Sequence, residues 1–504
     1  MPTPRVAIIG GGPSGIAAAI QLKRQLGIET VTIFEKSDKI GDWTYKYSYQ
    51  PEILAYFTRV YHEFGMTSKA RLGVVVPEIS WSDERQVWTV TLMNAKTREL
   101  IGKEEFEVVV SAIGGLHIPS FPDIKGRLSY KGESFHSAQW NHKVDLKDKK
   151  VAVIGNACSA AQFVPEIAKE VKELHVYQRT PNYMVPRRNF KFPWWLKLVF
   201  RYVPGAQRLW RLAGFIASEM SQLAFRRHGG IVAKLATYAV ALPHLRRLIK
   251  DPELRAKLTP KYAFGCKRVI VSDDYYPALT RPNVHLITER INEITEDGIT
   301  SGREEKGQLV PTHRDYDVII YGTGFEVRRF LSQLKIHGKA GLDLGEFWTL
   351  AGGVDAFKGT MVPGFPNFFT MLGPNTALGH YSVIFQIECQ IDLMIRVLRK
   401  IMKDGKGSVE PTKDAYLKYN QYLQKKMGTT VWSAGGCDSW YKTESGKVTT
   451  VWPGTCTEFM LDMRRGSWND YTMEGPKDWD KPKANLSFLL GSLVLGVVAV
   501  TASY

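Results

Sequence analysis

The first fifteen residues hold the feature that most restricts how this chain can fold. An apolar stretch, VAIIG, runs into the glycine-rich run Gly10–Gly15, and a segment rich in Ala and Ile follows. Gly10, Gly12 and Gly15 would allow a tight turn, close approach of a pyrophosphate and close packing of a helix whose N-terminus favours an anion. The next apolar segment, VTIFEK, ends in Glu35, where a carboxylate can bind ribose hydroxyls. The pattern predicts a strand–turn–helix unit that binds a dinucleotide, rather than a coincidental glycine-rich turn.

A second unit of the same kind begins at KKVAVIGNACSAAQF. Gly155 keeps the first glycine, whereas Ala157 and Ala160 replace the other two. Alanine is accepted at the third position, but the methyl group of Ala157 lies where backbone should approach a phosphate. We expect Gly155, together with Ser159 and Gln162 at the start of the following helix, to bind a cofactor. The alternative is a structural repeat of the first unit that binds no ligand.

The strand after this second turn, LHVYQRT, ends in Arg179 and Thr180 rather than in an acidic residue. An arginine at this place accommodates the 2′-phosphate that distinguishes NADPH from NADH. Two dinucleotide sites in one chain indicate FAD and NADPH, with NADPH as the hydride donor. We therefore predict an oxidoreductase with an α/β fold that contains two Rossmann-like domains.

The cysteines narrow the chemistry further. The chain has five, none of them in a C-x-x-C pair, and none precedes Cys158. A disulfide reductase would need a redox pair early in the FAD domain, so hydride transfer must end in dioxygen activation or in direct transfer to a substrate. The odd count and the spacing predict neither a disulfide framework nor a zinc ribbon, so a reducing compartment and no metal site are expected.

The linker YKGESFHSAQWNHKVDL suggests a family. Gly132, His136 and Trp140 match, in register, the fingerprint of class B flavin-dependent monooxygenases, and Trp140 is typical of their Baeyer–Villiger branch. Tyr130 stands where that fingerprint has Phe, and Asn141 where it ends in Pro or Asp. The chain thus resembles this branch, and the resemblance implies that His136 is an interdomain hinge residue rather than a catalytic base.

The resemblance covers nearly the whole chain and implies its organisation. Segments similar to the crossings between the two domains of the family occur at 111–126 and 316–325. Both domains would be three-layer α/β structures. The expected parts are an FAD domain in two pieces (1–142 and 326–483), an NADPH domain (143–325) and, within it, a helical insertion (188–262).

The resemblance also supplies a catalytic candidate. In the family, a Lys-Arg pair points at the flavin, and it maps onto Lys267 and Arg268. Baeyer–Villiger chemistry through a peroxyflavin needs a fixed cation, because negative charge develops as the ketone carbonyl is attacked. Arg268 is therefore the predicted catalytic residue, and Lys267 is expected to help hold the phosphate or ribose of NADP. Without the resemblance, such a pair would be interpreted as a surface pair.

The stretch GDWTYKYSYQPE departs from the family. In relatives, a long loop with flavin contacts and the carboxylate partner of the arginine follows the turn that ends in Trp43. Here Trp43, itself a predicted FAD contact, leads almost directly into Tyr47, so several tens of residues are missing. Either an exon is omitted from this sequence, or the protein is shortened and impaired. The activity of this chain depends on which of the two is true.

Charge and hydropathy raise the question of membrane contact. Of the net charge of +17, +15 falls between Arg187 and Arg268, where basic residues alternate with Trp, Leu and Phe. Such helices either lie on an anionic membrane or are solvated faces of an insertion, and no nucleic-acid motif accompanies them. Residues 484–504 carry no charge, and we expect them to be either a C-terminal anchor that leaves the enzyme on the cytosolic side or a buried terminal helix. No secretory leader is expected, since an apolar strand begins within five residues of the N-terminus.

The sequence thus predicts an NADPH- and FAD-dependent monooxygenase that inserts one atom of dioxygen next to a ketone carbonyl, with a hydrophobic ketone as substrate. Oxygenation of an amine or a sulfide is the enzymatic alternative, because the same reduced flavin can oxygenate soft nucleophiles. A flavin-free, membrane-tethered remnant is the alternative without catalysis.

Overall fold

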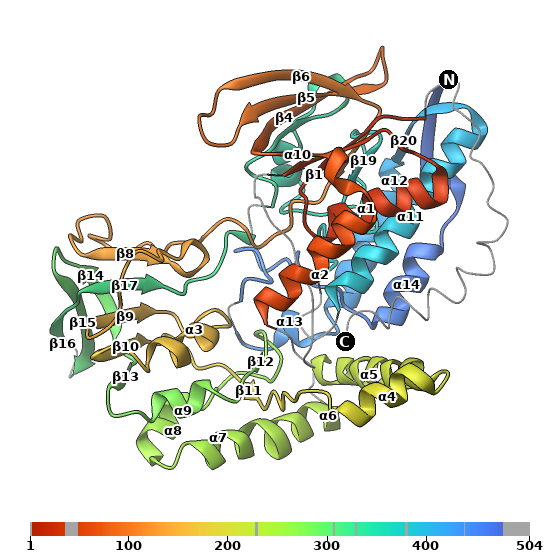
Figure 1. Cartoon of the computed structure of the whole chain (residues 1–504). Coiled ribbons are helices and arrows are strands. Elements are labelled where there is room, and N and C mark those ends of the chain that lie inside the picture. The colour runs from red at the N-terminus through yellow and green to blue at the C-terminus, as the bar shows by residue number, and fades with distance from the viewer. Residues whose placement is uncertain are drawn as a thin grey trace.

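A computed structural model describes residues 3–35, 49–226, 230–305, 308–327, 330–377, 382–437 and 439–476 of the chain. Figure 1 shows two α/β units side by side, with a row of helices from the insertion along one side of the molecule. The chain passes from the first unit into the second and then returns, so the first unit is built from two separate parts of the sequence. This division confirms the predicted fold class.

The first unit is built on a parallel five-stranded sheet in the order β19-β7-β1-β2-β3. Its central strand β1 (Val6–Ile9) is buried over its whole length and pairs in register with β2 (Val31–Glu35) and β7 (Val108–Ser111). A continuous apolar run of this kind is typical of a strand covered on both faces. The edges of the sheet are β19 (Phe368–Thr370) and β3 (Ala70–Leu72).

Two different layers cover the faces of this sheet. Val6 and Ile8 point towards α1 (Pro13–Leu26) and α11 (Val383–Asp404), whereas Ala7 and Ile9 point to the opposite face, because side chains alternate along a strand. That face packs against a four-stranded sheet in the order β18-β4-β5-β6. Its strands are β18 (Lys335–His337), β4 (Val74–Ser82), β5 (Val87–Asn94) and β6 (Leu100–Phe106).

The helical layer of the first unit comes from both of its sequence parts. Helix α1 begins with Pro13 at its first turn and ends before Gly27, whose left-handed φ of 68° closes the helix. Helix α11 packs against α1 and against α14 (Cys456–Arg464), and most of its apolar side chains are buried. Beyond α11 follow β20 (Lys406–Pro411), α12 (Lys413–Met427), α13 (Val431–Ala434) and β21 (Tyr471–Pro476).

The second unit repeats this plan with a parallel sheet in the order β13-β10-β9-β17-β8. Helices α3 (Ala160–Ile167) and α9 (Tyr275–Leu279) cover one face, and a three-stranded antiparallel sheet covers the other. The sheet strands are β8 (Glu133–His136), β9 (Lys150–Ile154), β10 (Glu173–Tyr177), β13 (Val284–Ile287) and β17 (Val318–Tyr321). The covering strands are β14 (Arg290–Ile294), β15 (Gly298–Glu305) and β16 (Gln308–Asp315).

The pairing of strand β8 places the boundary between the two units earlier in the chain than the sequence suggested. The predicted first part of the FAD domain ended at residue 142, yet β8 pairs in parallel with β17 of the second sheet, with His136 opposite Tyr321. The backbone at Lys125 also bridges to Glu293 of the second unit. The chain therefore crosses between the units before residue 125, and the predicted fingerprint segment belongs to the second unit.

The helical insertion lies between the paired strands β11 (Met184–Val185) and β12 (Ile270–Val271). Neither α4 (Trp194–Tyr202) nor α5 (Ala206–Ser221) has a buried residue, although both are rich in apolar side chains. Figure 1 shows both helices at the periphery of the molecule. The insertion continues through α6 (Gly230–Leu235), a π-helical segment (Ala236–Ala241), α7 (Leu242–Leu248) and α8 (Pro252–Leu258).

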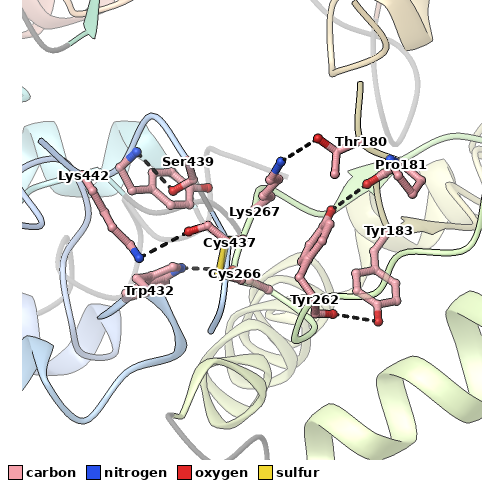
Figure 2. Close-up of a disulfide and its surroundings, with 12 residues drawn as sticks. Thr180, Pro181, Tyr183, Tyr262, Cys266, Lys267, Trp432, Cys437, Ser439 and Lys442 are labelled. Carbon is pink, nitrogen blue, oxygen red and sulfur yellow. Dashed lines mark hydrogen bonds between the residues drawn. A yellow bond between two sulfur atoms is a disulfide. The ribbon is translucent and has the colours of Figure 1, made fainter. Parts of the chain in front are cut away.

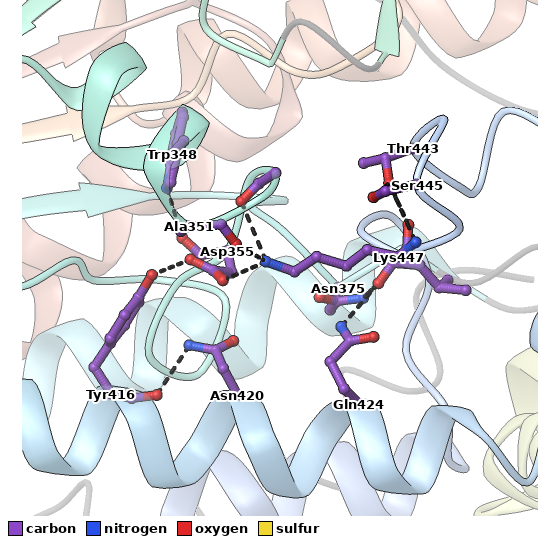
Figure 3. Close-up of polar contacts among 12 residues, drawn as sticks. Trp348, Ala351, Asp355, Asn375, Tyr416, Asn420, Gln424, Thr443, Ser445 and Lys447 are labelled. Carbon is purple, nitrogen blue, oxygen red and sulfur yellow. Dashed lines mark hydrogen bonds and ion pairs between the residues drawn. The ribbon is translucent and has the colours of Figure 1, made fainter.

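A buried ion pair ties the late part of the first unit together (Figure 3). The Nζ of Lys447 lies 2.7 Å from a carboxylate oxygen of Asp355 and donates to the carbonyls of Ala351 and Gly353 at 3.0 and 3.3 Å. The hydroxyl of Tyr416 in α12 donates to the same carboxylate. Because the carboxylate is buried, these donors fix the loop after α10 (Leu344–Leu350) against α12.

None of the helices in the described ranges is long and apolar enough to cross a membrane. The uncharged tail at 484–504, on which the predicted anchor depends, lies outside these ranges. Helix α2 (Gln50–Glu63) follows the shortened stretch around Trp43, and it has no buried residue.

Candidate active site

The first glycine-rich turn has the geometry that a pyrophosphate needs. Gly10 has a left-handed φ of 112°, and a Cβ there would lie 2.6 Å from the carbonyl oxygen of Ala112. A Cβ on Gly15 would lie 2.0 Å from the carbonyl oxygen of Gly10, whereas one on Gly12 would meet none of the described residues within 4 Å. The N-cap residue of α1 is Gly12, which has no side chain to cap the helix, and an anion suits the amides of such an N-terminus. These residues fit a dinucleotide phosphate.

Buried polar atoms without partners lie near the carboxyl ends of the strands in the same sheet. Ser111 ends β7, Asn375 follows β19, and Gln386 lies in the first turns of α11. Each is at most 2% exposed and keeps a side-chain polar atom that makes no hydrogen bond with any described residue: the Ser111 hydroxyl, the Asn375 Oδ1 and both amide atoms of Gln386. In open α/β sheets, ligands bind beyond the carboxyl ends of the strands. The polar groups of a flavin fit such atoms, because unsatisfied buried polar groups are costly.

Two predicted FAD contacts cannot be placed. Glu35 is the last residue of β2, as expected from its spacing, but its side chain lies outside the part of the structure that is described. Trp43 and the junction that follows it also fall outside the described residues. The missing flavin loop therefore stays a prediction from the sequence.

The second turn repeats the geometry of the first at one glycine. Gly155 has a φ of 110°, and a Cβ there would lie 2.4 Å from the carbonyl oxygen of Gly322. Ala157 is exposed, so its methyl group faces outwards from the turn. Ser159 is the N-cap residue of α3 and makes no side-chain capping bond. The exposed Gln162 donates to the carbonyl of Cys158 at 3.0 Å, within the start of the helix.

Asn156 ties this turn to the end of β10. Its buried Nδ2 donates to the Oε1 of Gln178 at 2.8 Å and to the carbonyl of Thr180 at 3.0 Å. Gln178 in turn donates to the carbonyl of Lys257 at 2.8 Å, at the end of α8. We did not select Asn156 or Gln178 from the sequence, although Asn156 lies inside the motif, directly after Gly155.

The predicted phosphate-binding residues come together from distant segments. Arg179 is exposed at the end of β10, and the Oγ1 of Thr180 accepts a hydrogen bond from the Nζ of Lys267 at 3.2 Å (Figure 2). The Nζ of Lys267 also lies 5.3 Å from the ring centre of Tyr262. An exposed guanidinium and a half-buried ammonium at this place suit an anionic phosphate.

Arg268 lies between the second turn and the late part of the first unit. Burial raises the pKa of the Cys158 thiol, and the charge of Arg268 partly offsets this rise. Burial likewise raises the pKa of Tyr441, and the charge of Arg268 lowers this pKa in part. Over the described ranges, the exposed guanidinium makes no hydrogen bond or ion pair. It is thus a cation between the two units with no protein carboxylate bound to it among these residues.

A disulfide holds this cationic turn in place, contrary to the prediction that the cysteines form no framework. Cys266, directly before Lys267, is bonded to Cys437, 171 residues later (Figure 2). The indole nitrogen of Trp432 donates to the carbonyl of Gly265 at 3.2 Å, beside the same link. The turn that carries Lys267 and Arg268 is therefore fastened to the second part of the first unit. The sequence could not indicate this pairing, because cysteine spacing does not show which residues meet in space.

The fingerprint residues lie where the chain crosses between the units. His136 is 1% exposed and lies between the rings of Phe121 and Phe325, which belong to the two crossings. Its Nδ1 accepts from the Ala138 amide at 3.1 Å, and burial lowers its pKa. Trp140 packs on Phe163 of α3. A neutral, buried imidazole at both crossings suits a hinge better than a catalytic base.

Gly132 has a steric reason to be glycine. A Cβ at Gly132 would lie 2.5 Å from the hydroxyl oxygen of Tyr130, which donates to the carbonyl of Tyr316 at 2.8 Å. Tyr130 therefore fills the space beside Gly132 and links the linker to the end of β16. Its replacement of the Phe of the fingerprint adds this hydrogen bond.

Two dinucleotide units with a cation between them define a flavoprotein oxidoreductase that also uses a nicotinamide nucleotide. Two family models match this chain. Residues 8–71 match an NAD(P)-binding Rossmann-like domain, and residues 49–209 match a flavin-binding monooxygenase-like domain. These matches support the predicted cofactors, NADPH and FAD.

Curated relatives narrow the class to a family. A Baeyer-Villiger monooxygenase of Pseudomonas aeruginosa is 37% identical over 484 residues, which cover 90% of this chain and 88% of that protein. A Baeyer-Villiger monooxygenase of Streptomyces coelicolor is 34% identical over 501 residues, which cover 94% and 93% of the two chains. The chain belongs to the family of Baeyer–Villiger monooxygenases, which confirms the resemblance found in the sequence.

Solved structures agree on the fold. The crystal structure of OTEMO in complex with FAD and NADP has a TM-score of 0.79 and 24% sequence identity, and the match covers 94% of this chain and all of that chain. The oxidised steroid monooxygenase bound to NADP has a TM-score of 0.77 and 23% identity, with coverage of 93% and 99%.

Proposed function

We propose that this chain uses NADPH, FAD and dioxygen to insert one oxygen atom next to a ketone carbonyl, which yields an ester or a lactone. When bound, NADPH supplies hydride, and reduced FAD activates dioxygen. Family membership supports the reaction class, and the two glycine-rich turns supply the cofactor sites.

The residues of the second unit would bind and orient NADPH. Arg179 and Lys267 offer two positive charges around Thr180, and Asn156 fixes the end of β10 against the nucleotide turn. A phosphate held by these groups makes charge-assisted hydrogen bonds, which are about twice as strong as neutral ones. The 2′-phosphate of NADPH is the group that would distinguish it from NADH here.

The position of Arg268 is the observation that carries the proposal. Arg268 follows Lys267 directly, and its guanidinium lies close enough to Cys158 and Tyr441 to influence both. The backbone of this turn is held by the disulfide of Cys266, two residues before Arg268. The charge of Arg268 would stabilise the negative charge that develops on the ketone oxygen during attack. Because the disulfide links the turn to the late part of the first unit, the backbone that carries Arg268 would keep its place between the two units during the reaction.

Arg268→Ala tests this role. We expect ester formation to fall by about 10²–10³-fold, while NADPH still reduces the bound flavin, since the cofactor contacts stay intact. The matched control is Arg290→Ala, which removes an exposed arginine from β14 of the second unit. Unchanged ester formation in Arg268→Ala would refute the assignment, and an equal loss in the control would show a general electrostatic effect instead.

A substrate panel tests the reaction itself. Purified protein with NADPH would be given cyclic ketones and thioethers, including large hydrophobic ones. Ester products without sulfoxides support Baeyer–Villiger oxidation. Sulfoxides without esters would instead support heteroatom oxygenation, the alternative from the sequence. Lack of flavin absorbance even after addition of FAD would exclude both reactions for this chain.

We further propose that the enzyme works at a membrane surface on the cytosolic side. The tail at 484–504 has no charged residue. Helices α4 and α5 expose aromatic side chains, with Trp194 at 74% and Tyr202 at 67% exposure. Residues 191–218 contain five basic residues and no acidic one, which suits an anionic lipid surface.

Truncation after Lys483, tested alone and together with Trp194→Ser, separates the two contacts. If the full-length protein binds vesicles of neutral lipid and the truncated protein does not, the tail makes this contact. If the truncated protein still binds anionic vesicles, and this binding weakens with added salt and with Trp194→Ser, the helices α4 and α5 make the second contact. A full-length protein that stays in solution with both kinds of vesicle would refute the membrane proposal.

A further inference from the structure

Three potential metal ligands meet on the second sheet, on the face that the sheet β14–β16 covers. His175 of β10 and His285 of β13 are register partners in neighbouring parallel strands, so their side chains stand next to each other. Glu173 precedes His175 by two residues and therefore shares its face. One ligand atom from each residue can be chosen so that all three lie within 4.8 Å of one another.

The distances suit one small ion. The Oε1 of Glu173 lies 3.1 Å from the Nε2 of His175 and 3.6 Å from the Nε2 of His285. Two ligand atoms that each lie about 2.0–2.1 Å from a tetrahedral zinc ion are about 3.3 Å apart. These two separations bracket this value, and all three ligand atoms lie within 4.8 Å of one another, so side-chain rotations would bring them towards a single ion.

A hydrogen bond behind the cluster orients one of its ligands. The Nδ1 of His175 lies 2.6 Å from the hydroxyl oxygen of Tyr316, which is 2.9 Å from the hydroxyl of Tyr177. When the Nδ1–H donates to Tyr316, the Nε2 of His175 is left with a lone pair that faces Glu173. Outer partners of this kind fix the ring and the tautomer of metal-binding histidines.

The partly exposed side chains of the cluster allow an ion to enter, and the nearby positive charge of Arg314 is paired with a carboxylate. The side chain of His175 is 13% exposed, that of Glu173 35% and that of His285 46%, so the cluster is walled on the Tyr316 side and open on the other. The positive charge of Arg314 reaches His175, but Arg314 forms an ion pair of 2.9 Å with Glu289. The open side gives access to water as a fourth ligand.

We propose that Glu173, His175 and His285 bind one divalent transition metal ion, with zinc as the best match for two imidazoles and a carboxylate. The ion would fasten the edge strand β13 to β10, the strand that leads to Arg179 and Thr180. It takes no part in the oxygenation and is independent of the proposed function. Cysteine spacing does not indicate this site, and His285 lies 110 residues after His175, so no short sequence pattern joins the three ligands.

The competing interpretation is a plain ion pair between Glu173 and protonated histidines. Full-length protein without a histidine tag, first treated with a chelator, would be titrated with Zn²⁺ by calorimetry and with Co²⁺ by visible absorption at neutral pH. We expect one saturable ion per chain, a Co²⁺ spectrum of a four-coordinate site, and a melting temperature that rises with Zn²⁺. Absence of saturable binding would overturn the proposal in favour of the ion pair.

Variants assign the ligands. His285 is an exposed residue of the edge strand β13, so the fold should tolerate His285→Ala. This variant should weaken Zn²⁺ binding by more than about tenfold. Tyr316→Phe should weaken binding by about 10–100-fold, as expected for the loss of an outer partner. His313→Ala is the matched control, since His313 pairs with Asp297 in the same unit and belongs to no three-ligand group among the described residues. Equal binding in His285→Ala and the wild type, or an equal loss in the control, would refute the assignment.

Discussion

Alanine substitutions at two glycines of the first turn should separate packing from ligand binding. A Cβ on Gly15 would lie 2.0 Å from the Gly10 carbonyl oxygen, and ordinary contact begins at 3.4 Å. Helix α1 would therefore have to move away from the turn by about 1.4 Å. Overpacking of this kind typically costs 1–3 kcal/mol. We expect Gly15→Ala to lower the free energy of unfolding of the apo protein by about 3 kcal/mol and to abolish FAD binding.

Gly12→Ala provides the contrast. Its φ of −72° suits any residue, and a Cβ there would meet no atom of the part of the chain that the structure describes within 4 Å. The apo protein should lose less than about 1 kcal/mol, the range of an N-cap change. FAD affinity should nevertheless fall at least about tenfold, because the methyl group occupies the space that a pyrophosphate needs. The assays are denaturant unfolding of the apo protein and fluorescence titration with FAD. Wild-type FAD affinity in Gly12→Ala would refute the placement of the pyrophosphate.

Three further predictions follow from charged groups. Arg179→Ala should weaken NADPH binding about tenfold or more and NADH binding little, and equal effects on the two would remove Arg179 from the 2′-phosphate site. Lys447→Met should lower the free energy of unfolding by about 3–5 kcal/mol because it leaves the buried Asp355 carboxylate uncompensated, and a loss as small as that of an exposed lysine variant would contradict this. Burial raises the pKa of Glu388 from 4.5 to about 7, so the folded state keeps a proton that the unfolded state releases between these pH values. Wild-type stability should therefore fall by about 3 kcal/mol across that window relative to Glu388→Gln, and a constant difference in unfolding free energy would refute this effect of burial.

Local patterns in the sequence predicted the nucleotide-binding turns. In each turn the glycine, the strand before it and the helix after it lie within about thirty residues, so one short segment carries the whole geometry. Gly10 and Gly155 have the left-handed φ that the pattern requires, and Thr180 lies beside Lys267. The linker around Trp140 was sufficient to indicate the family.

Contacts between distant segments could not be predicted in this way. The pairing of Cys266 with Cys437 and the meeting of His175 with His285 depend on how strands and turns assemble, which spacing does not encode. Strand β8 is short and half exposed, so no periodic pattern marked its place in the second sheet. The suspected deletion after Trp43 concerns residues outside the described part, so it stays an inference from the sequence.

Incubation of the purified full-length chain with FAD, NADPH, a cyclic ketone and isotopically heavy dioxygen tests the central claim most directly. Mass spectrometry of the product would show where the oxygen atom comes from. The account predicts an ester or lactone that carries one heavy oxygen atom, formed only when NADPH is present. A protein that binds FAD and oxidises NADPH but yields only peroxide and unchanged ketone would contradict it.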